Sequence, residues 1–255
     1  MSDKNELDLD FELRHWNPKA RPYQKVLCAA VVGYSRFVMT KLNRLEFIER
    51  QNWEYAFQNS NRGILSFSNH VSLFDDPLLV SNLGRVKFSD VRWIGADHKN
   101  FYGSAFKGFI SAAGKCVPIV RGAGLDQPGL TFLAERLKAG DWVHIFPEGG
   151  RTRDEHARMK TPFKLGIGQL ITVAKPMLAP FYHYGMHDVL PIGTTVPKRG
   201  RQVRVLFDEP IAVDDAWLEE HDIDPHSATT DDFQTLAQWS FERLRRLELI
   251  MHPDP

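Results

Sequence analysis

A histidine and an aspartate with four residues between them, His70 and Asp75, are the side chains in this sequence best suited to acid–base chemistry. A neutral imidazole titrates near physiological pH and can take a proton from a hydroxyl group in a transition state. A carboxylate bonded to the second ring nitrogen fixes the tautomer and stabilises the imidazolium that forms. The pair therefore predicts activation of a hydroxyl that attacks directly, without a serine or cysteine nucleophile.

The spacing alone does not identify this pair, because the chain has ten histidines and repeats the spacing at His183 and Asp188. A structural hydrogen bond at the start of a helix explains a His–Asp pair equally well. The surrounding sequence has to distinguish the two pairs.

The sequence around His70 predicts a bend between two elements. The apolar run 63–68 predicts a buried strand, and Asp76 followed by Pro77 predicts the N-cap and first position of a helix that ends near residue 83. His70 is expected where the strand ends and Asp75 at the entrance of the helix. The bend would let the carboxylate fold back onto the imidazole ring.

Two further segments carry groups that an anionic substrate would need. Arg121 follows the apolar residues 117–120, and its planar guanidinium matches the geometry of phosphate oxygens. Residues 146–149, Phe-Pro-Glu-Gly, place an acidic turn after another predicted strand. Alternatively, Arg121 points to solvent and the turn merely ends the strand.

These segments resemble the glycerolipid acyltransferase superfamily in order and approximate spacing. Within it, residues 140–149, 163–168 and 183–191 resemble the tafazzin branch, and the similarity covers about residues 63–210. The resemblance implies transfer of a fatty acyl chain from a phospholipid to a lysophospholipid without CoA, to remodel cardiolipin or related phospholipids. It implies no cofactor and no metal.

The resemblance also assigns roles to residues. His70 would be the general base and Asp75 the partner that orients it. Because the pair at His183 and Asp188 follows the glutamate segment, where the family does not place its base, we expect a structural role there. The residues expected to bind the substrates are Asn69, Arg121, Glu148, Gly149, Arg151 and Lys164.

One segment departs from the tafazzin pattern. Residues 150–153, Gly-Arg-Thr-Arg, are more similar to lysophosphatidate acyltransferases that depend on acyl-CoA. An acyl-CoA-dependent lysophospholipid (1-acylglycerol-3-phosphate) acyltransferase is therefore the alternative. A third hypothesis is a non-catalytic lipid-binding protein that only grips headgroups.

The charge distribution favours lipid headgroups over nucleic acid. With 32 basic and 32 acidic residues, the formal net charge is zero, and no basic stripe with interleaved aromatic residues is present. Local basic clusters can still attract anionic headgroups, although solvated surface is the ordinary role of such charges. The clusters comprise Arg151, Arg153, Arg158, Lys160 and Lys164, and then Lys198, Arg199, Arg201 and Arg204.

The apolar stretch 26–39 indicates how the chain can meet a membrane. As a helix its fourteen residues reach about 21 Å, whereas crossing the hydrocarbon core takes about 30 Å. Arg36 also interrupts it. We expect an interfacial or re-entrant helix, or alternatively an ordinary core helix. Its apolar face comprises Leu27, Ala30, Val31, Tyr34, Phe37 and Val38.

Other features bear on location. The aromatic residues Phe101, Tyr102, Phe106 and Phe109 are candidates for a second lipid-facing patch, or for ordinary core. The acidic segment 1–12 predicts neither a secretory signal nor a cleaved mitochondrial presequence. The resemblance implies a monotopic or peripheral membrane protein, on mitochondrial membranes in a eukaryote or at the inner membrane in a bacterium.

Alternating helices and short apolar strands predict an α/β fold with a largely parallel or mixed sheet flanked by helices. We expect an N-terminal arm over 1–24, an interfacial helical segment over 25–62 and an acyltransferase domain over 63–255. Cys28 and Cys116 indicate no disulfide framework or zinc site, and the sequence leaves the oligomeric state open.

The expected strands cover residues 63–68, 91–96, 117–120, 142–146, 177–184 and 203–207. The expected helices cover 26–59 in one or more pieces, 76–83, 101–113, 125–139, 166–173, 216–220 and 233–251. The last helix is amphipathic and closes the domain, with apolar residues at Phe233, Leu236, Trp239, Leu244, Leu247 and Ile250.

Overall fold

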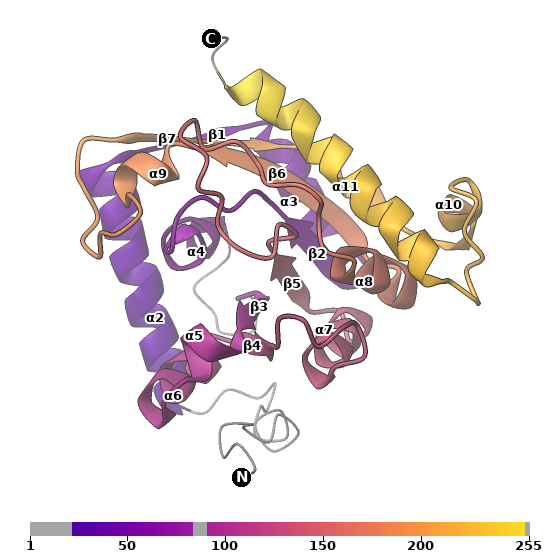
Figure 1. Ribbon diagram of the computed structural model, residues 1–255. Helices are drawn as coiled ribbons and strands as arrows, with labels where there is room; N and C mark the ends of the chain where they lie inside the picture. Colours follow the sequence, from indigo (N-terminus) through magenta and orange to yellow (C-terminus); the bar gives the residue numbers. More distant parts are fainter. Residues whose placement is uncertain (1–21, 84–90, 253–255) are drawn as a thin grey trace.

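The computed structural model describes residues 22–83 and 91–252 (Figure 1). Within them, an eight-stranded mixed sheet is flanked by helices, which confirms the expected α/β class. Residues 1–21 of the predicted N-terminal arm lie outside the described residues.

The sheet has the strand order β1–β7–β6–β2–β5–β3–β4, with β8 paired to β6. Strand β6 is antiparallel to β7 and β8, whereas the other neighbours are parallel. The strands are β1 (Arg44–Ile48), β2 (Ile64–Phe67), β3 (Trp93–Asp97), β4 (Cys116–Ile119), β5 (Trp142–Ile145), β6 (Met177–Tyr184), β7 (Gln202–Phe207) and β8 (Ile211–Ala212). Because β2, β5, β3 and β4 are parallel, their carboxyl ends share one edge of the sheet, where open α/β sheets bind ligands.

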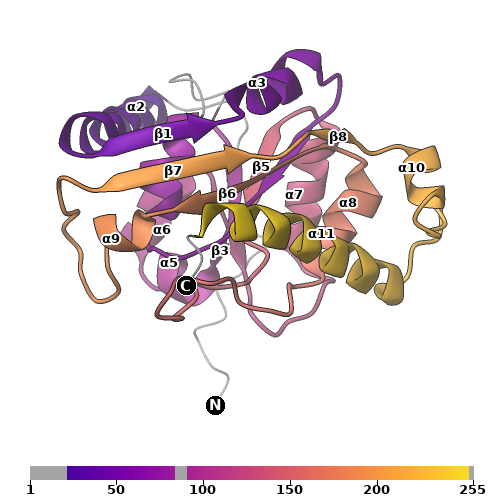
Figure 2. The same ribbon diagram turned by 90° about the horizontal axis from the view of Figure 1, so that it is seen from above.

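Helices cover both faces of the sheet, and Figure 2 shows α3 and α11 on opposite sides of it. Side chains of β2 alternate accordingly: Leu65 and Phe67 belong to the core beneath α7, α8 and α11, and Ile64 to the core beneath α3. The helices are α2 (Pro22–Phe37), α3 (Arg50–Asn59), α4 (Ser81–Leu83), α5 (His98–Tyr102), α6 (Ala105–Ala113), α7 (Pro128–Lys138), α8 (Gly166–Ala174), α9 (Met186–Val189), α10 (Asp215–Glu219) and α11 (Thr230–Met251), with π-helical turns η1 (Val38–Leu42) and η2 (Asp75–Val80).

The prediction of a helical segment from 26 to 59 was wrong in its middle. Residues 44–48 form β1, which pairs in parallel with β7. Leu45 and Phe47 pack on the core beneath α3, while Ile48 packs on the opposite core. This period of two is typical of a strand, and β1 joins the segment 25–62 to the same sheet as the residues that follow. The six predicted strands are present within two residues of their expected bounds.

The helix predicted over 76–83 is also different. A π-helical turn from Asp75 to Val80 precedes the short helix α4. Asp76, the expected N-cap, instead forms a partly buried ion pair with Arg92, whose Nε donates to the carboxylate at 2.5 Å. Arg92 also donates to the Gly114 carbonyl at 2.8 Å, which ties η2 to β3 and to the end of α6.

Helix α2 turns its predicted apolar face mostly outward. It buries Cys28, Val32 and Ser35, and the Ser35 hydroxyl donates to the Leu78 carbonyl at 2.6 Å. Of the predicted apolar face, Leu27 is half-buried, Val38 is buried in η1, and the rest is exposed: Ala30, Val31, Tyr34 and Phe37.

The predicted aromatic patch divides in two. Tyr102 is buried and its hydroxyl donates to the Cys116 carbonyl at 2.5 Å, and Phe101 packs partly on the core. Phe106 and Phe109 on α6 are exposed. Among residues 22–83 and 91–252, none of the helices has the length and apolar composition needed to cross a bilayer.

Candidate active site

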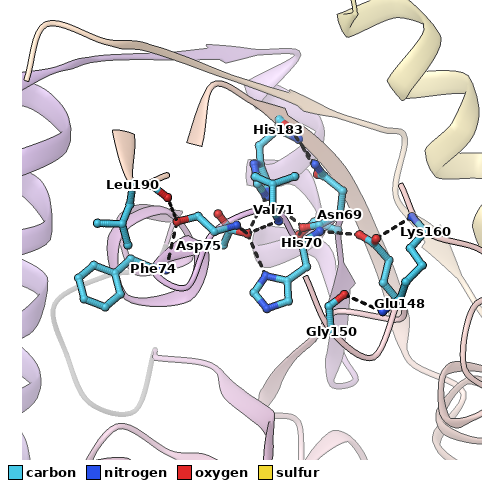
Figure 3. A network of polar contacts seen from close by, with 12 residues as sticks. Asn69, His70, Val71, Phe74, Asp75, Glu148, Gly150, Lys160, His183 and Leu190 are labelled. Carbon is cyan, nitrogen blue, oxygen red and sulfur yellow. Dashed lines mark hydrogen bonds and ion pairs between the residues drawn. The ribbon is translucent and has the colours of Figure 1, made fainter. Parts of the chain in front are cut away.

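His70 and Asp75 meet in the turn between β2 and η2 (Figure 3). The Nδ1 atom of His70 lies 2.9 Å from Oδ2 of Asp75, so the predicted bend brings the carboxylate onto the ring. The same oxygen accepts hydrogen bonds from the backbone amides of Val71 at 2.7 Å and Ser72 at 2.8 Å. These two amides fix the carboxylate, and the carboxylate fixes the ring.

Asp75 is fully buried, yet its surroundings favour the charged carboxylate. Burial by itself would raise the pKa of Asp75, but the nearby imidazole of His183, the hydrogen bond from His70 and the amide of Ser72 lower that pKa overall. A carboxylate at this position can only accept hydrogen bonds, so Nδ1 of His70 carries the proton. The neutral ring then has its lone pair on Nε2.

The ring of His70 is accessible on the side away from Asp75. Its side chain is 18% exposed, and among the described residues none is hydrogen-bonded to Nε2. Phe146 stacks on the ring with centroids 4.1 Å apart and planes 11° apart, which restricts rotation of the imidazole. In Figure 3 the ring points away from the buried Asn69 and His183.

Two buried residues, Asn69 and His183, lie on the interior side of the His70–Asp75 pair. The Asn69 amide donates to the His183 carbonyl and accepts from the His183 amide, both at 2.9 Å. His183 Nε2 lies 3.0 Å from the Asn69 carbonyl and 3.8 Å from Asp75 Oδ2. Asn69 was predicted to bind substrate, and that contact stays a prediction. In the structure its buried side chain holds β6 against the turn that carries His70.

Glu148 lies behind the turn as well. It is fully buried, and its two oxygens accept from the amides of His70 at 2.6 Å and Lys160 at 2.7 Å. Burial raises the pKa of Glu148 to about 7, although both amides act in the opposite direction. Glu148 therefore positions the backbone of His70, and the predicted contact between Glu148 and the acceptor stays a prediction.

Residues 149–152, which follow Glu148, contact the turn that carries His70. Gly149 has a φ of 67°, which favours glycine, and a side chain there would collide with the stem of Lys164. The Lys160 ammonium donates to the Gly150 carbonyl at 3.2 Å, and the Thr152 amide donates to the His70 carbonyl at 2.8 Å. Lys164 is exposed and Arg151 half-buried.

Arg121 reaches the same edge of the sheet from the end of β4. Its Nε lies 2.6 Å from Oδ2 of Asp97, at the end of β3, and its side chain is 60% exposed. A side-chain carbon at Gly150 would lie only 3.4 Å from Arg121 Nη2, so the guanidinium approaches the segment after Glu148. The carboxyl ends of β2, β5, β3 and β4 thus carry His70, Glu148, Asp97 and Arg121.

Two residues of the site, Phe146 and Lys160, had no specific role in the sequence prediction, and a third, His183, was expected only as a structural partner of Asp188. Phe146 stacks on the base, Lys160 links Glu148 to Gly150, and His183 contacts Asp75. His183 does not pair with Asp188. The Asp188 carboxylate oxygen Oδ2 instead lies 3.7 Å from Nε2 of His187. Lys160 belonged to a predicted basic cluster and Phe146 to the predicted acidic turn. The sequence therefore pointed to both segments but did not predict what these two residues contact.

Comparison with known proteins places this chain in a family. The Acyltransferase family model matches residues 44–204. Tafazzin from Drosophila melanogaster is 32% identical over 199 residues, which cover 75% of this chain and 52% of that protein. Taffazin from Dictyostelium discoideum is 33% identical over 181 residues, covering 67% and 62% respectively. The chain therefore spans about half to three fifths of the length of these two relatives.

Two further matches are more distant. N-acylphosphatidylethanolamine synthase from Arabidopsis thaliana is 28% identical over 204 residues, which cover 75% of this chain and 71% of that protein. The crystal structure of the 1-acyl-sn-glycerophosphate acyltransferase PlsC from Thermotoga maritima has the same fold, with a TM-score of 0.61 and 18% identity over 96% of this chain and 89% of that one. The likeness to tafazzins is thus confirmed, and this chain belongs to the acyltransferase family.

Proposed function

We propose that this protein transfers a fatty acyl chain from a phospholipid to a lysophospholipid at a membrane surface, without CoA, to remodel cardiolipin or related phospholipids. The observation that carries the proposal is the 2.9 Å contact between His70 Nδ1 and Asp75, which leaves Nε2 as an accessible base. The tafazzin relatives support the choice of reaction.

The reaction requires one base that becomes an acid. Nε2 of His70 takes the proton of the acceptor hydroxyl while its oxygen attacks the acyl carbonyl of the donor. Asp75 stabilises the imidazolium that forms. When the tetrahedral intermediate breaks, the donor's ester oxygen leaves and receives the proton from Nε2. One ester bond forms, one breaks, and His70 returns to its neutral form.

Cations around the His70 turn suit the phosphates of both substrates. Arg121 is mostly exposed and Lys164 lies beside Gly149, while Lys160 approaches the Gly150 carbonyl. Each basic residue near a headgroup contributes on the order of 1 kcal/mol. Arg121 and Lys164, with the half-buried Arg151, are the proposed phosphate contacts.

The proposed membrane contact is the outward face of α2 together with α6. Val26 is 71% and Phe106 75% exposed, and Tyr23 of α2 stacks on Phe109 of α6 with ring centroids 5.2 Å apart. Exposed Lys25 and Arg36 on α2 can meet anionic headgroups. By resemblance to tafazzins, the membrane would be mitochondrial in a eukaryote and the inner membrane in a bacterium.

Acyl-CoA as the donor is the second candidate. Residues 150–153 favour it, because their sequence resembles the acyl-CoA-dependent enzymes of the superfamily. The geometry around His70 serves either donor equally. The choice therefore depends on a direct assay.

The proposal is tested by incubating the purified protein with unlabelled lysophospholipid and a phospholipid whose acyl chains are labelled. Parallel incubations contain acyl-CoA. We expect label to move to the lysophospholipid in the absence of CoA. Transfer only from added acyl-CoA would select the second candidate, and binding without transfer would indicate a lipid-binding protein.

Flotation with anionic liposomes tests the membrane contact. Serine at Val26, Phe37 and Phe106 should release the protein from liposomes, because these substitutions remove exposed apolar surface. Serine at Leu249 and Ile250, which are exposed on α11, is the matched control and should leave flotation unchanged. Release by the α11 substitutions alone would place the contact elsewhere.

A further inference from the structure

Two consecutive backbone amides are held by two buried glutamates from different parts of the chain. The amide of Met159 donates to Oε1 of Glu248 on α11 at 2.7 Å. The next amide, of Lys160, donates to Oε2 of Glu148 at 2.7 Å. Both glutamate side chains are fully buried. One short stretch of backbone is thus fixed between the C-terminal helix and the candidate active site.

This stretch depends on such anchors because it lacks regular structure. Residues 146–165 are described throughout and contain neither helix nor strand. Without the regular hydrogen bonds of a helix or strand, their amides must be satisfied by isolated backbone carbonyls, by side chains or by solvent. Glu148 and the His70 carbonyl hold the segment on the side of the site, and Glu248 holds it on the side of α11.

Glu248 itself is held firmly. The hydroxyl of Tyr182, on β6, donates to its Oε1 at 3.3 Å, and Arg245 forms an ion pair with Oε2. The same Tyr182 hydroxyl lies 2.7 Å from Nε2 of His252, just after α11. The carboxyl group that receives the Met159 amide therefore has a fixed position relative to the sheet.

The anchored segment carries Arg151, one of the proposed phosphate contacts, and Lys160, a second cation near the His70 turn. Lys160 directly follows Met159, and its ammonium reaches the Gly150 carbonyl at 3.2 Å. Arg121 approaches Gly150 as well: a side-chain carbon built there would lie 3.4 Å from Arg121 Nη2 and 3.5 Å from Lys160 Nζ. A shift at Met159 would move Lys160 and loosen the contact at Gly150. Phosphate binding would suffer first, because Lys160 lies on this segment, whereas the amides of Val71 and Ser72 fix the carboxylate that holds the His70 ring.

We propose that Glu248 is a positioning residue. Through it, α11 holds the segment 150–160 in the position that binding of a phosphate-bearing acceptor requires. This inference rests on the proposed function for the acceptor's identity. The anchor lies outside residues 44–204, which the Acyltransferase family model matches, so it is a property of this chain's C-terminal helix. Glu248 acts through the backbone of Met159 and touches no substrate.

Hydrogen exchange and steady-state kinetics of three variants test the inference. Glu248→Leu fills the same space without an acceptor, and should speed exchange of amides 150–160 by about tenfold, the scale of one lost hydrogen bond. The apparent KM for lysophospholipid should rise by a similar factor of about ten, with kcat within about twofold. Glu248→Gln keeps an oxygen for the Met159 amide and should restore both values.

Leu247→Ala is the control for a merely structural effect. Leu247 is the buried neighbour of Glu248 on α11 and packs on the core beneath that helix. Its truncation should lower the melting temperature but leave both the exchange of residues 150–160 and the KM unchanged. The inference fails if Leu247→Ala reproduces both changes, or if Glu248→Leu changes neither. Because exchange needs no substrate, absence of transacylation in the wild type would count against the proposed function alone.

Discussion

The pairs His70–Asp75 and His183–Asp188 share one spacing, but the fold brings only the first pair together. His70 and Asp75 span a turn that folds back, so their side chains meet at 2.9 Å. His183 lies near the end of β6, and Asp188 lies on α9 beyond Gly185, whose φ is 100°. His183 consequently turns toward Asp75, at 3.8 Å, while the Asp188 side chain is 57% exposed. Direction of the backbone, rather than spacing, decides which residues form a pair.

The two histidines around Asp75 also differ in what they can do. His70 is partly exposed and its Nε2 is accessible, whereas His183 is fully buried and its Nε2 contacts the Asn69 carbonyl at 3.0 Å. Burial lowers the pKa of His183, although the nearby Asp75 carboxylate acts in the opposite direction. A general base needs both a partner on one nitrogen and access to the other, and only His70 has both.

Replacing the exposed histidine gives the largest expected effect. His70→Ala should lower kcat by about 10²–10⁴, the usual contribution of a general base. Transfer of labelled acyl chains is the measurement, with circular dichroism to show that the variant is folded. A variant that kept more than about a tenth of the wild-type rate would remove His70 from this role.

Asp75→Asn should have an effect no larger than that of His70→Ala, on the order of 10²–10⁴ in kcat. An uncharged amide oxygen accepts the three hydrogen bonds that Oδ2 receives more weakly than a carboxylate does, and an NH₂ group turned toward His70 would favour the wrong tautomer of the ring. Near-normal kcat with an intact fold would show that the ring needs no carboxylate.

The same substitution has a signature in acid. Because the folded-state pKa of Asp75 is lowered, its ionisation stabilises the fold above the unfolded value of 3.8, and this contribution disappears as pH falls through the folded pKa. The stability difference between wild type and Asp75→Asn should therefore shrink from pH 6 to pH 3 in urea unfolding. An equal difference at both values would contradict the lowered pKa.

Much of the fold follows from short apolar runs that the sequence displays openly. Strand β2 and strand β6 are such runs, and both were predicted within a residue of their bounds. Strand β1 was missed because Arg44 and Glu46 interrupt it, and because its neighbours on both sides are helical. Only pairing with β7 gives these five residues a reason to be extended.

The site was predictable as a set of residues but not as a set of contacts. The position of His70 after a strand and before a helical turn predicted the pairing with Asp75. Nothing in the local sequence predicted that Asn69 would bond to the backbone of His183, 114 positions away. Likewise, the apolar pattern of α11 predicted burial of Ile250, which is 66% exposed, while Glu248 is buried. Long-range satisfaction of polar groups overrides the helical pattern at these positions.

His183→Phe sharpens the comparison within the Asp75 cluster. Phenylalanine fills the buried space but cannot donate to the Asn69 carbonyl or lie as a polar neighbour of Asp75. We expect kcat to fall by about tenfold, equivalent to ~1.4 kcal/mol, because Asp75 would hold His70 less firmly. The remaining activity should still require His70, so adding His70→Ala to His183→Phe should lower kcat further. A loss as large as that of His70→Ala would mean that His183 takes part in proton transfer.

Asp188→Asn should leave both kcat and the free energy of unfolding almost unchanged, in contrast to Asp75→Asn. The carboxylate is exposed and lies 3.7 Å from His187, a contact that is worth little at a surface. We expect kcat within about twofold of wild type and a free energy of unfolding within about 0.5 kcal/mol. Transfer assays and urea unfolding of Asp188→Asn and Asp75→Asn in parallel measure both quantities. If Asp188→Asn lost as much kcat as Asp75→Asn, the second pair would have to form in the working protein, and the distinction drawn from backbone direction would be wrong.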